Sequence, residues 1–465
     1  MKKTMSFLLI LAVVLGLCAC GGSEQKQEEN VGLQIGYARE DITPSDPTPL
    51  AGYGMTSQRF HNNVLDFIYG TCIAATQGEE TVLFYTIDMI LPANDWVAAL
   101  RNSVSQETGV PEDHIMVSYT HTHSAPDPWS SEPVIKTYKS EWTRILTKAA
   151  KNALADRTPA TISATKLDVP GMNFVRHYQN DQGQKGGYSD LPGTFVGHAE
   201  PNDPQMRLLK FDREGDKKDI LLMNWQAHPC YINSYQKDLS ADYIGVIRQE
   251  VELLTGMNFA FFLGATGNHN TNSVIESEAH KLNMKKYGAK LAEVAVAALP
   301  ELQPVEGEGV KTSQIQFEYD YNHEQEDKAV YVGEIMDVWE KEGYDAAKTL
   351  SQQYGLSSPH VASSLKARVS RPKTGTIELN VVRIGGFAFV AAPYEMFASS
   401  GMYIKENSPF DMTMIFTCSN QYNAYFPTTE AFEYGCYEAN CTNLLPGGGE
   451  QIQEEFLVML EDMAQ

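Results

Sequence analysis

Two histidines lie two residues apart at the end of a predicted buried strand. Residues 115–119 read IMVSY, and a turn with the sequence SAPD begins at Ser124. In an extended chain, residues two apart point to the same side, so His121 and His123 would face one pocket while Thr122 points away. Two neutral imidazoles that converge are the start of a zinc site. They could instead be polar residues that cap a loop, because two ligands do not complete a coordination sphere.

Three other residues near predicted strand ends could complete such a site. The apolar stretch 220–229 (ILLMNWQAHP) ends in a polar turn that carries His228. The small-residue loop 264–270 carries His269, a weaker candidate because its surroundings read as flexible. Glu395 follows the predicted strand 387–392 and could supply the anionic ligand that two or three histidines leave missing.

Other residues could support the site or bind its substrate. Asp88 is the charged residue in the apolar run 81–91, and a buried carboxylate needs a partner. We expect it to hold a histidine ligand in place through a hydrogen bond. Arg176 could be a surface cation or a clamp on a substrate oxygen. Gly52 and Gly54 lie in a stretch whose backbone either approaches a ligand closely or makes an ordinary tight turn.

The elements around these residues predict an α/β fold. Residues 81–91 and 115–119 read as strands, with a helix from Asn94, as its cap, to about residue 107 between them. This order predicts a β-α-β unit with parallel strands. Residues 376–384 and 387–392 read as a hairpin. Residues 300–373 carry charge runs and are predicted to be an insertion or a lid. Further helices are expected at 132–155, 241–256 and 278–298, the last capped by Ser277, and further strands at 33–44, 160–169 and 259–263.

The composition is typical of a globular protein and argues against some partners. With 465 residues, of which 43% are hydrophobic and 20% charged, the chain can bury a sizeable core. Its formal net charge of −23 argues against binding to nucleic acid and against electrostatic docking on anionic lipid.

The first 30 residues predict export and a lipid anchor. Lys2 and Lys3 precede an apolar stretch, 7–17, that is too short to span a bilayer. The sequence LCAC at 17–20 resembles a bacterial lipobox, so residues 1–19 are predicted to be a lipoprotein signal peptide and Cys20 the lipidated N-terminus. Ordinary secretion is the alternative. Residues 20–30 would be a flexible tether, and residues 31–465 the folded domain on the outer face of a bacterial membrane.

Beyond the leader, the cysteines are Cys72, Cys230, Cys418, Cys436 and Cys441. An exported protein can hold disulfides, and Cys436 and Cys441 are close enough in sequence to close a small loop. Their spacing does not predict a zinc ribbon, so a structural role is expected for them.

Five motifs occur in the order and rough spacing of the neutral ceramidases, and the chain resembles the catalytic domain of that family. The motifs are DITP at 41–44, THTHS at 120–124, NWQAHP at 224–229, PYE at 393–395 and the tyrosine-rich stretch 420–437. The resemblance covers about residues 31–300 and 375–465. It implies an α/β fold with mixed β-sheets flanked by helices.

The family's zinc amidase chemistry maps onto this chain residue by residue. By this resemblance the Zn²⁺ ligands would be His121, His228, Glu395 and Tyr425. The reacting carbonyl would be lined by His123, Arg176 and Tyr437. The implied reaction is hydrolysis of the amide bond of an N-acyl lipid, with ceramide cleaved to a sphingoid base and a fatty acid.

Two departures from the family pattern matter. The family's Gly-Asp-x-Ser loop reads GNHN at 267–270, so a mechanism with that serine as nucleophile is disfavoured. The chain also ends about where the family's catalytic domain ends, so no C-terminal immunoglobulin-like domain is expected. We therefore expect amide hydrolysis, with ceramide as the leading substrate.

Three alternatives stay open. A zinc amidohydrolase on a (β/α)₈ barrel would also use His-x-His on a strand, although Glu395 and Tyr425, late in the chain, argue against it. A zinc hydrolase or esterase could act on another acyl substrate. A surface lipoprotein could bind lipids or glycans without catalysis.

Overall fold

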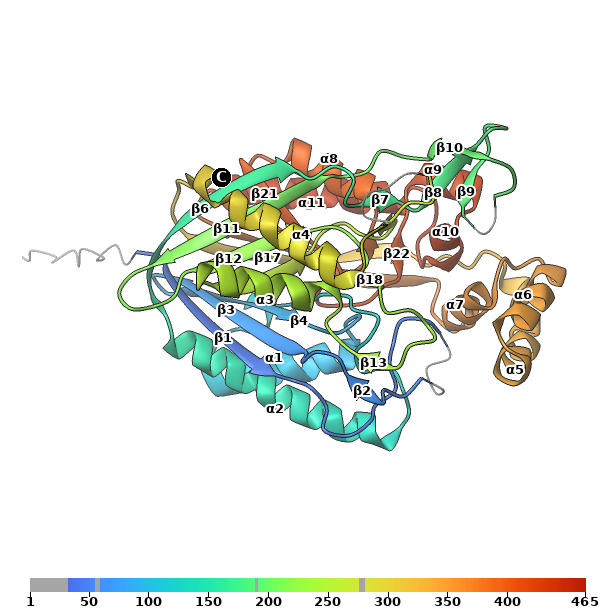
Figure 1. Ribbon diagram of the computed structural model, residues 1–465, viewed down its shortest axis with the longest axis horizontal. Coiled ribbons are helices and arrows are strands. Elements are labelled where there is room, and N and C mark those ends of the chain that lie inside the picture. Colours follow the sequence, from blue (N-terminus) through green and yellow to red (C-terminus); the bar gives the residue numbers. More distant parts are fainter. Residues whose placement is uncertain (1–31, 55–58, 189–190, 276–280) are drawn as a thin grey trace, which may run out of the picture. The chain divides into compact units, whose positions relative to one another are not determined.

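Two β-sheets packed face to face, with helices on their outer faces, form the main body of the described residues (Figure 1). The computed structural model describes residues 32–54, 59–188, 191–275 and 281–465. The predicted signal peptide, the lipidated Cys20, the tether and the helix cap Ser277 lie outside these residues.

The larger sheet has nine strands and mixed pairing. Its strands are β1 (Gln34–Asp41), β3 (Tyr69–Gln77), β4 (Glu80–Ile87), β5 (Ile115–Tyr119), β6 (Thr158–Asp168), β11 (Gln205–Arg213), β12 (Ile220–Trp225), β14 (Asn258–Leu263) and β16 (Gln303–Pro304). They are ordered β14-β12-β11-β6-β1-β3-β4-β5, and β16 pairs with β6. β4 is parallel to β5 and β12 is parallel to β14, whereas the pairs between them are antiparallel.

The smaller sheet has four strands in the order β17-β18-β19-β21. Their bounds are β17 (Val310–Asp320), β18 (Thr374–Ile384), β19 (Phe387–Ala391) and β21 (Met412–Phe416). β18 and β19 form the predicted hairpin, and β21 runs parallel to β19. Strands in two packed sheets rule out the (β/α)₈-barrel alternative.

Helices cover the outer face of each sheet. The larger sheet packs against α1 (Asn94–Thr108), α2 (Pro133–Ala155), α3 (Tyr243–Thr255) and α4 (Met284–Ala297), and the smaller sheet packs against α8 (Ala398–Asn407) and α11 (Gly448–Ala464). The predicted β-α-β unit is confirmed, because α1 connects the parallel strands β4 and β5. The predicted α/β fold with mixed sheets flanked by helices is likewise confirmed.

Strand β4 shows how the sequence pattern builds these layers. Its residues are apolar on both faces, as expected for a strand covered on both sides. Leu83, Tyr85 and Ile87 belong to the core beneath the helices, while Val82 and Phe84 belong to the core between the sheets. The alternation of period two therefore supplies apolar side chains to two separate cores.

The region 300–373 is more structured than the sequence predicted. Strand β17 pairs with β18 along its whole length, so it is part of the smaller sheet. The charged run after it contains a 3₁₀ helix (Glu326–Tyr331) and helices α5 (Val332–Glu342), α6 (Tyr344–Gln353) and α7 (Pro359–Val369), which share a small core with Tyr425 and Cys441. The prediction of an unstructured-looking region is thus corrected for β17, whereas the description of 300–373 as an insertion or a lid stays a prediction.

Short elements connect these layers. They are β2 (Asn63–Val64) with β13 (Asp238–Leu239), β7 (Phe174–Val175) with β15 (His269–Asn270), β20 (Glu395–Met396) with β22 (Tyr425–Phe426), the three strands β8 (His177–Asn180), β9 (Lys185–Gly187) and β10 (Phe195–His198), helices α9 (Thr429–Tyr434) and α10 (Tyr437–Cys441), and 3₁₀ turns at Glu112–His114 and Leu299–Glu301. Several of them carry the residues of the candidate site.

Some local predictions differ from the structure. Helix α4 begins at Met284, where the Asn283 side chain accepts a hydrogen bond from Lys286 N (3.0 Å). The residue that caps α1 is Ala93, and Asn94 is its first helical residue. The five described cysteines are free, so Cys436 and Cys441 do not form a disulfide. Among the described residues, no helix combines the length and the apolar character needed to cross a membrane.

Candidate metal centre

The ends of β5 and β12 meet although these strands are far apart in the sheet order. The edge strands β14 and β5 contact each other, and the backbone of residues 417–420 donates hydrogen bonds to both of them. His121 lies two residues beyond β5 and His228 three residues beyond β12. The curl of the sheet therefore brings both histidines to one place.

The structure brings together three of the candidate histidines. The ring centroids are 4.8 Å apart for His121 and His228, and 5.1 and 5.7 Å from these two rings to His123. One nitrogen from each ring lies within 4.8 Å of the others, close enough to share a metal ion. The backbone differs from the predicted extended strand, because His121 has a left-handed φ of 67°. Such strain persists where the surrounding structure enforces it, often at functional sites.

Backbone carbonyls orient two of these rings. His121 Nδ1 lies 2.7 Å from Ile90 O, and His228 Nδ1 lies 2.9 Å from His269 O. A carbonyl can only accept, so each Nδ1 carries the proton and each Nε2 is left as a free ligand atom. This arrangement, in which the second nitrogen is held by a hydrogen bond, is typical of metal-binding histidines.

Glu395 faces both free nitrogens. Its Oε2 lies 3.2 Å from His228 Nε2 and 3.4 Å from His121 Nε2. A tetrahedral zinc ion with bonds of about 2.0–2.1 Å separates its ligand atoms by roughly 3.4 Å, so the three atoms have the spacing of zinc ligands. The Glu395 side chain is buried, with 2% of its surface exposed. Its Oε2 makes no hydrogen bond within the described residues.

Tyr425 is aligned with Glu395 by a two-residue parallel strand pair. Glu395 and Tyr425 are direct partners in the pairing of β20 with β22, so their side chains emerge on the same face. Tyr425 is 9% exposed, and its ring centre lies 5.8 Å from Cζ of Arg176. The donor set thus comprises two imidazoles, a carboxylate and an adjacent phenol.

His123 is half-buried, but both its ring nitrogens are buried and have no hydrogen-bond partner in the described part of the chain. Burial holds its pKa well below the usual range, so the ring is neutral. Gly52 has a φ of 111°, and a Cβ placed there would lie 2.6 Å from His123 Nδ1. The close approach of the backbone to His123 therefore explains why position 52 is a glycine.

Arg176 belongs to the site and is not a free surface cation. Its Nη2 donates to Gly267 O (2.9 Å), and its Nε donates to Glu438 Oε1 (2.6 Å). Tyr437, at the start of α10, is 36% exposed, and its ring lies 5.7 Å from that of Tyr425. All seven residues that the family resemblance pointed to therefore lie in one region.

Two other predicted site residues have different surroundings. Asp88 accepts hydrogen bonds from Arg248 of α3 and from Tyr69 N, both at 2.8 Å. Its predicted role beside a histidine ligand is wrong, because the buried carboxylate is neutralised by arginine and the histidines are held by carbonyls. His269 is fully buried, with its Nδ1 3.2 Å from Ala265 O and its Nε2 accepting from Asp203 N (3.2 Å). It contributes its carbonyl to His228 and has both ring nitrogens engaged.

Sequence reasoning missed two supporting residues. Arg59 is buried and donates to the carbonyls of Ala51 and His123, each at 2.8 Å, which ties the glycine loop to the histidine segment. Nothing in its local sequence marks it, because its partners are distant in the chain. Glu438 could have been noticed as the neighbour of Tyr437, but its role depends on Arg176.

A second group of potential metal ligands lies nearby. His177, Cys436 and Glu438 are buried, and their ligand atoms lie within 4.8 Å of one another. His177 Nε2 lies 2.8 Å from Glu438 Oε2, and His177 Nδ1 lies 2.9 Å from the Tyr434 hydroxyl. Both imidazole nitrogens thus already have protein partners, in contrast to the Nε2 atoms of His121 and His228.

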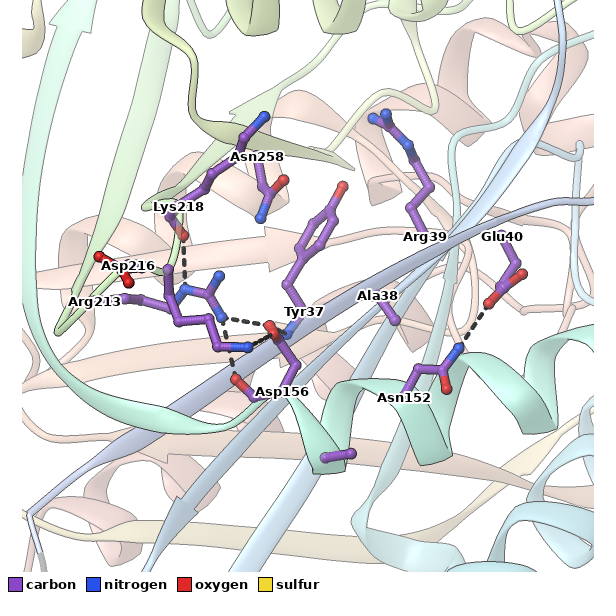
Figure 2. A pocket seen from close by; sticks show the side chains of 12 residues that line it. Tyr37, Ala38, Arg39, Glu40, Asn152, Asp156, Arg213, Asp216, Lys218 and Asn258 are labelled. Carbon is purple, nitrogen blue, oxygen red and sulfur yellow. Dashed lines mark hydrogen bonds and ion pairs between the residues drawn. The ribbon is translucent and has the colours of Figure 1, made fainter.

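A separate pocket of about 690 Å³ lies at the start of β12 and β14 (Figure 2). His228 follows the other end of β12, so this pocket does not contain the histidine cluster. Its charged groups bind one another: Asp156 pairs with Arg213 (2.6 Å) and Lys217 (2.5 Å). Among the residues described, the side-chain groups that could hold a metal ion are the histidine cluster and the neighbouring group of His177, Cys436 and Glu438.

No protein-family model matches the sequence of this chain. Its fold, however, is similar to that of neutral ceramidase from Pseudomonas aeruginosa, with a TM-score of 0.71, 15% sequence identity, and coverage of 94% of this chain and 75% of that one. A second similar structure is described as a ceramidase complexed with C2, with a TM-score of 0.70, 15% identity, and coverage of 94% and 76%. The predicted resemblance to neutral ceramidases is confirmed at the level of the fold.

Proposed function

We propose that this chain is a zinc-dependent hydrolase of the amide bond of N-acyl lipids. The observation that carries this proposal is the placement of Glu395 Oε2 at 3.2 and 3.4 Å from the Nε2 atoms of His228 and His121. Buried donors with this spacing and no other partner suit a zinc ion. The similarity of the fold to a neutral ceramidase supports the reaction class.

The donor set fits zinc better than it fits a harder cation. Two imidazole nitrogens, His121 Nε2 and His228 Nε2, are ligands that zinc prefers, whereas calcium and magnesium take oxygen ligands. Glu395 would supply the third ligand atom and the Tyr425 hydroxyl a further one, beside a position left for water. When bound, zinc supplies a hydroxide nucleophile at neutral pH and polarises the carbonyl group.

Arg176 and Tyr437 would stabilise the negative charge that grows on the carbonyl oxygen. Both are donors, and Arg176 is fixed by Gly267 and Glu438 before any substrate arrives. Donors placed in advance stabilise developing charge without having to reorganise. The residue at position 270, where the family has its serine, is Asn270, so the proposed reaction has no serine nucleophile.

His123 would act as the general base and then as the general acid of the reaction. The bond between the carbonyl carbon and nitrogen breaks only if the leaving nitrogen gains a proton, because an amide anion is too basic to depart. His123 is neutral and both its nitrogens are unpartnered within the described structure. It can therefore accept the proton that the attacking water releases and donate it to the leaving amine.

Ceramide is the leading substrate, cleaved to a sphingoid base and a fatty acid. The proposal rests on the fold shared with a neutral ceramidase and with a ceramidase complexed with C2. Another acyl amide or an ester is the alternative substrate class. A lipid anchor at Cys20 on the outer face of a bacterial membrane would place the enzyme where such substrates partition; this localisation is part of the proposal.

The test is release of fatty acid from ceramide by the purified chain, with and without a zinc chelator. We expect release that the chelator abolishes and that added zinc restores. A chain that holds zinc but releases nothing from ceramide would move the proposal to other N-acyl substrates and esters. A chain that releases nothing from any of them would favour a lipid-binding or glycan-binding protein.

A further inference from the structure

Arg176 and His177 are neighbours in the chain and hold the two oxygens of one buried carboxylate. Glu438 Oε1 accepts from Arg176 Nε (2.6 Å) and lies 2.5 Å from Arg176 Nη2. Glu438 Oε2 lies 2.8 Å from His177 Nε2. Because Glu438 is 1% exposed, water does not screen these contacts, and charged hydrogen bonds of this kind are strong.

The other ring nitrogen of His177 is also hydrogen-bonded to a protein group. Its Nδ1 lies 2.9 Å from the hydroxyl of Tyr434, which donates to Glu200 Oε1 (2.5 Å). Burial alone would lower the pKa of His177, but Glu438 and then Cys436 and Glu200 raise it well above the usual range. The ring is therefore an imidazolium that donates from both nitrogens, toward Glu438 and toward Tyr434.

These contacts fix the guanidinium of Arg176. Its backbone N donates to Asn268 O (2.8 Å) and its Nη2 to Gly267 O (2.9 Å), so the 267–268 loop holds one side while Glu438 holds the other. The guanidinium is left beside the ring of Tyr425, 5.8 Å from its centre. An arginine side chain has many rotamers, and one that must donate to a reacting oxygen needs such restraint.

We propose that Glu438 is a positioning residue, which uses the support of His177 to aim the Arg176 guanidinium at the carbonyl oxygen of the substrate. This inference rests on the proposed hydrolase function. Glu438 does not touch substrate; it acts through Arg176. The arrangement also explains how the partly exposed Arg176 and the buried His177 can be adjacent cations: the shared carboxylate and Glu200 balance their charge.

The same geometry argues against a second metal ion at His177, Cys436 and Glu438. A histidine that binds a metal ion must be neutral and have a free ring nitrogen. Both ring nitrogens of His177, in contrast, donate to protein groups. Both oxygens of Glu438 are likewise engaged by cations. A further cation would be repelled by Arg176 and His177.

A double-mutant cycle tests the proposal. The variants are Glu438→Gln, Arg176→Ala and the two combined, and kcat, KM and zinc content are measured for each. We expect Glu438→Gln to lower kcat roughly 10- to 100-fold at unchanged zinc content. The double variant should match Arg176→Ala to within about twofold, because residues that act as one unit are not additive. Independent, multiplicative losses in kcat would overturn the proposal.

A matched control removes the carboxylate of another buried arginine pair. Glu378 binds Arg101 through two contacts of 2.8 Å and lies outside the site. Glu378→Gln should lower the melting temperature without lowering kcat. An equal loss of kcat in Glu378→Gln and Glu438→Gln would show that reduced stability, and not a displaced Arg176 guanidinium, explains the effect. Where Glu438→Gln does not fold, Glu438→Asp keeps the charge, shortens the side chain, and should still lower kcat.

Binding of the fatty-acid product gives a readout independent of turnover. Medium-chain fatty acid, titrated by calorimetry, should bind about 10-fold more weakly to Glu438→Gln and to Arg176→Ala, with no further loss in the double variant. A wild type that binds zinc and fatty acid but cleaves no N-acyl substrate would refute the proposed function while leaving this test intact. A second equivalent of zinc per chain, lost in Glu438→Gln, would instead make the cluster a metal site.

Discussion

Glu395 and Tyr425 are direct partners in two short parallel strands, β20 and β22, that lie outside both main sheets. β20 comes shortly after β19, and β22 follows the loop after β21. Their pairing is therefore a tertiary contact and not a continuation of either sheet. Its effect is to place a carboxylate and a phenol side by side against two histidines from the larger sheet. The candidate metal centre is therefore assembled where the two sheets end together.

The two tyrosines near the centre should behave differently. Tyr425→Phe removes the proposed fourth ligand and should weaken zinc binding at least about 10-fold, measured by competition with a chelator. Tyr437→Phe should bind zinc like the wild type and lose roughly 100-fold in kcat, because its hydroxyl is assigned to the carbonyl oxygen. Each variant is the control for the other. Unchanged zinc affinity in Tyr425→Phe would remove that residue from the ligand set.

His121 and His123 should also separate into two roles. We expect His121→Ala to lose bound zinc, since it removes the Nε2 that faces Glu395. His123→Ala should retain zinc and lose about 10²- to 10⁴-fold in kcat, the usual contribution of a general acid or base. Metal analysis alongside turnover distinguishes these outcomes. Loss of metal from His123→Ala would make His123 a ligand and leave the proton transfer unassigned.

Gly52→Ala should damage the site without touching the metal. The new Cβ would lie 2.6 Å from His123 Nδ1, so the imidazole must move. We expect a large fall in kcat at unchanged zinc content, because small displacements of a catalytic group are costly.

The control for Gly52→Ala is Gly78→Ala. Gly78 also has a left-handed φ, of 62°, but a Cβ there meets nothing within 4 Å. Both variants carry backbone strain of roughly 1–2 kcal/mol, which thermal unfolding will report. Equal turnover in the two variants would mean that the contact with His123 has no catalytic consequence.

Asp242 should make stability fall as the pH rises toward neutrality. Burial raises the pKa of its carboxyl from about 3.8 to about 7, although backbone N–H groups of Tyr243 and Ile232 oppose this. The folded state then binds more protons than the unfolded state, so stability present below about pH 4 is lost as the pH rises to about 7. The slope is about 1.4 kcal/mol per pH unit.

Asp242→Asn removes this titration. Compared by urea unfolding at pH 5 and pH 8, the variant should gain on the order of 2–3 kcal/mol relative to the wild type. Asparagine can still accept a hydrogen bond from Tyr243 N, so the start of α3 should be kept. Stability differences that are the same at both pH values would show that Asp242 does not titrate in this range.

The sequence was most informative where local pattern and tertiary structure agree. The apolar runs before His121 and His228, and the hairpin before Glu395, are strands in the structure, because strands buried in two packed sheets are continuously apolar. Strand β17 was missed for the opposite reason. Its residues are largely half-exposed or exposed, so its composition reads as polar although it pairs fully with β18.

Contacts between distant residues could not be predicted in this way. Asp88 was expected beside a histidine, but its partner is Arg248 of α3. The local sequence around neither residue predicts this pair. The left-handed φ of His121 is imposed by the surrounding structure and leaves no trace in residue type. Tyr425 entered only through resemblance to a family, because a lone tyrosine is rarely a metal ligand.

Anomalous scattering from crystals of the protein, recorded on both sides of the zinc absorption edge, will show whether one zinc ion is held by His121, His228 and Glu395. We expect one zinc peak about 2 Å from His121 Nε2, His228 Nε2 and the Glu395 carboxylate. An absent peak in zinc-loaded protein, or a peak confined to His177, Cys436 and Glu438, would contradict it.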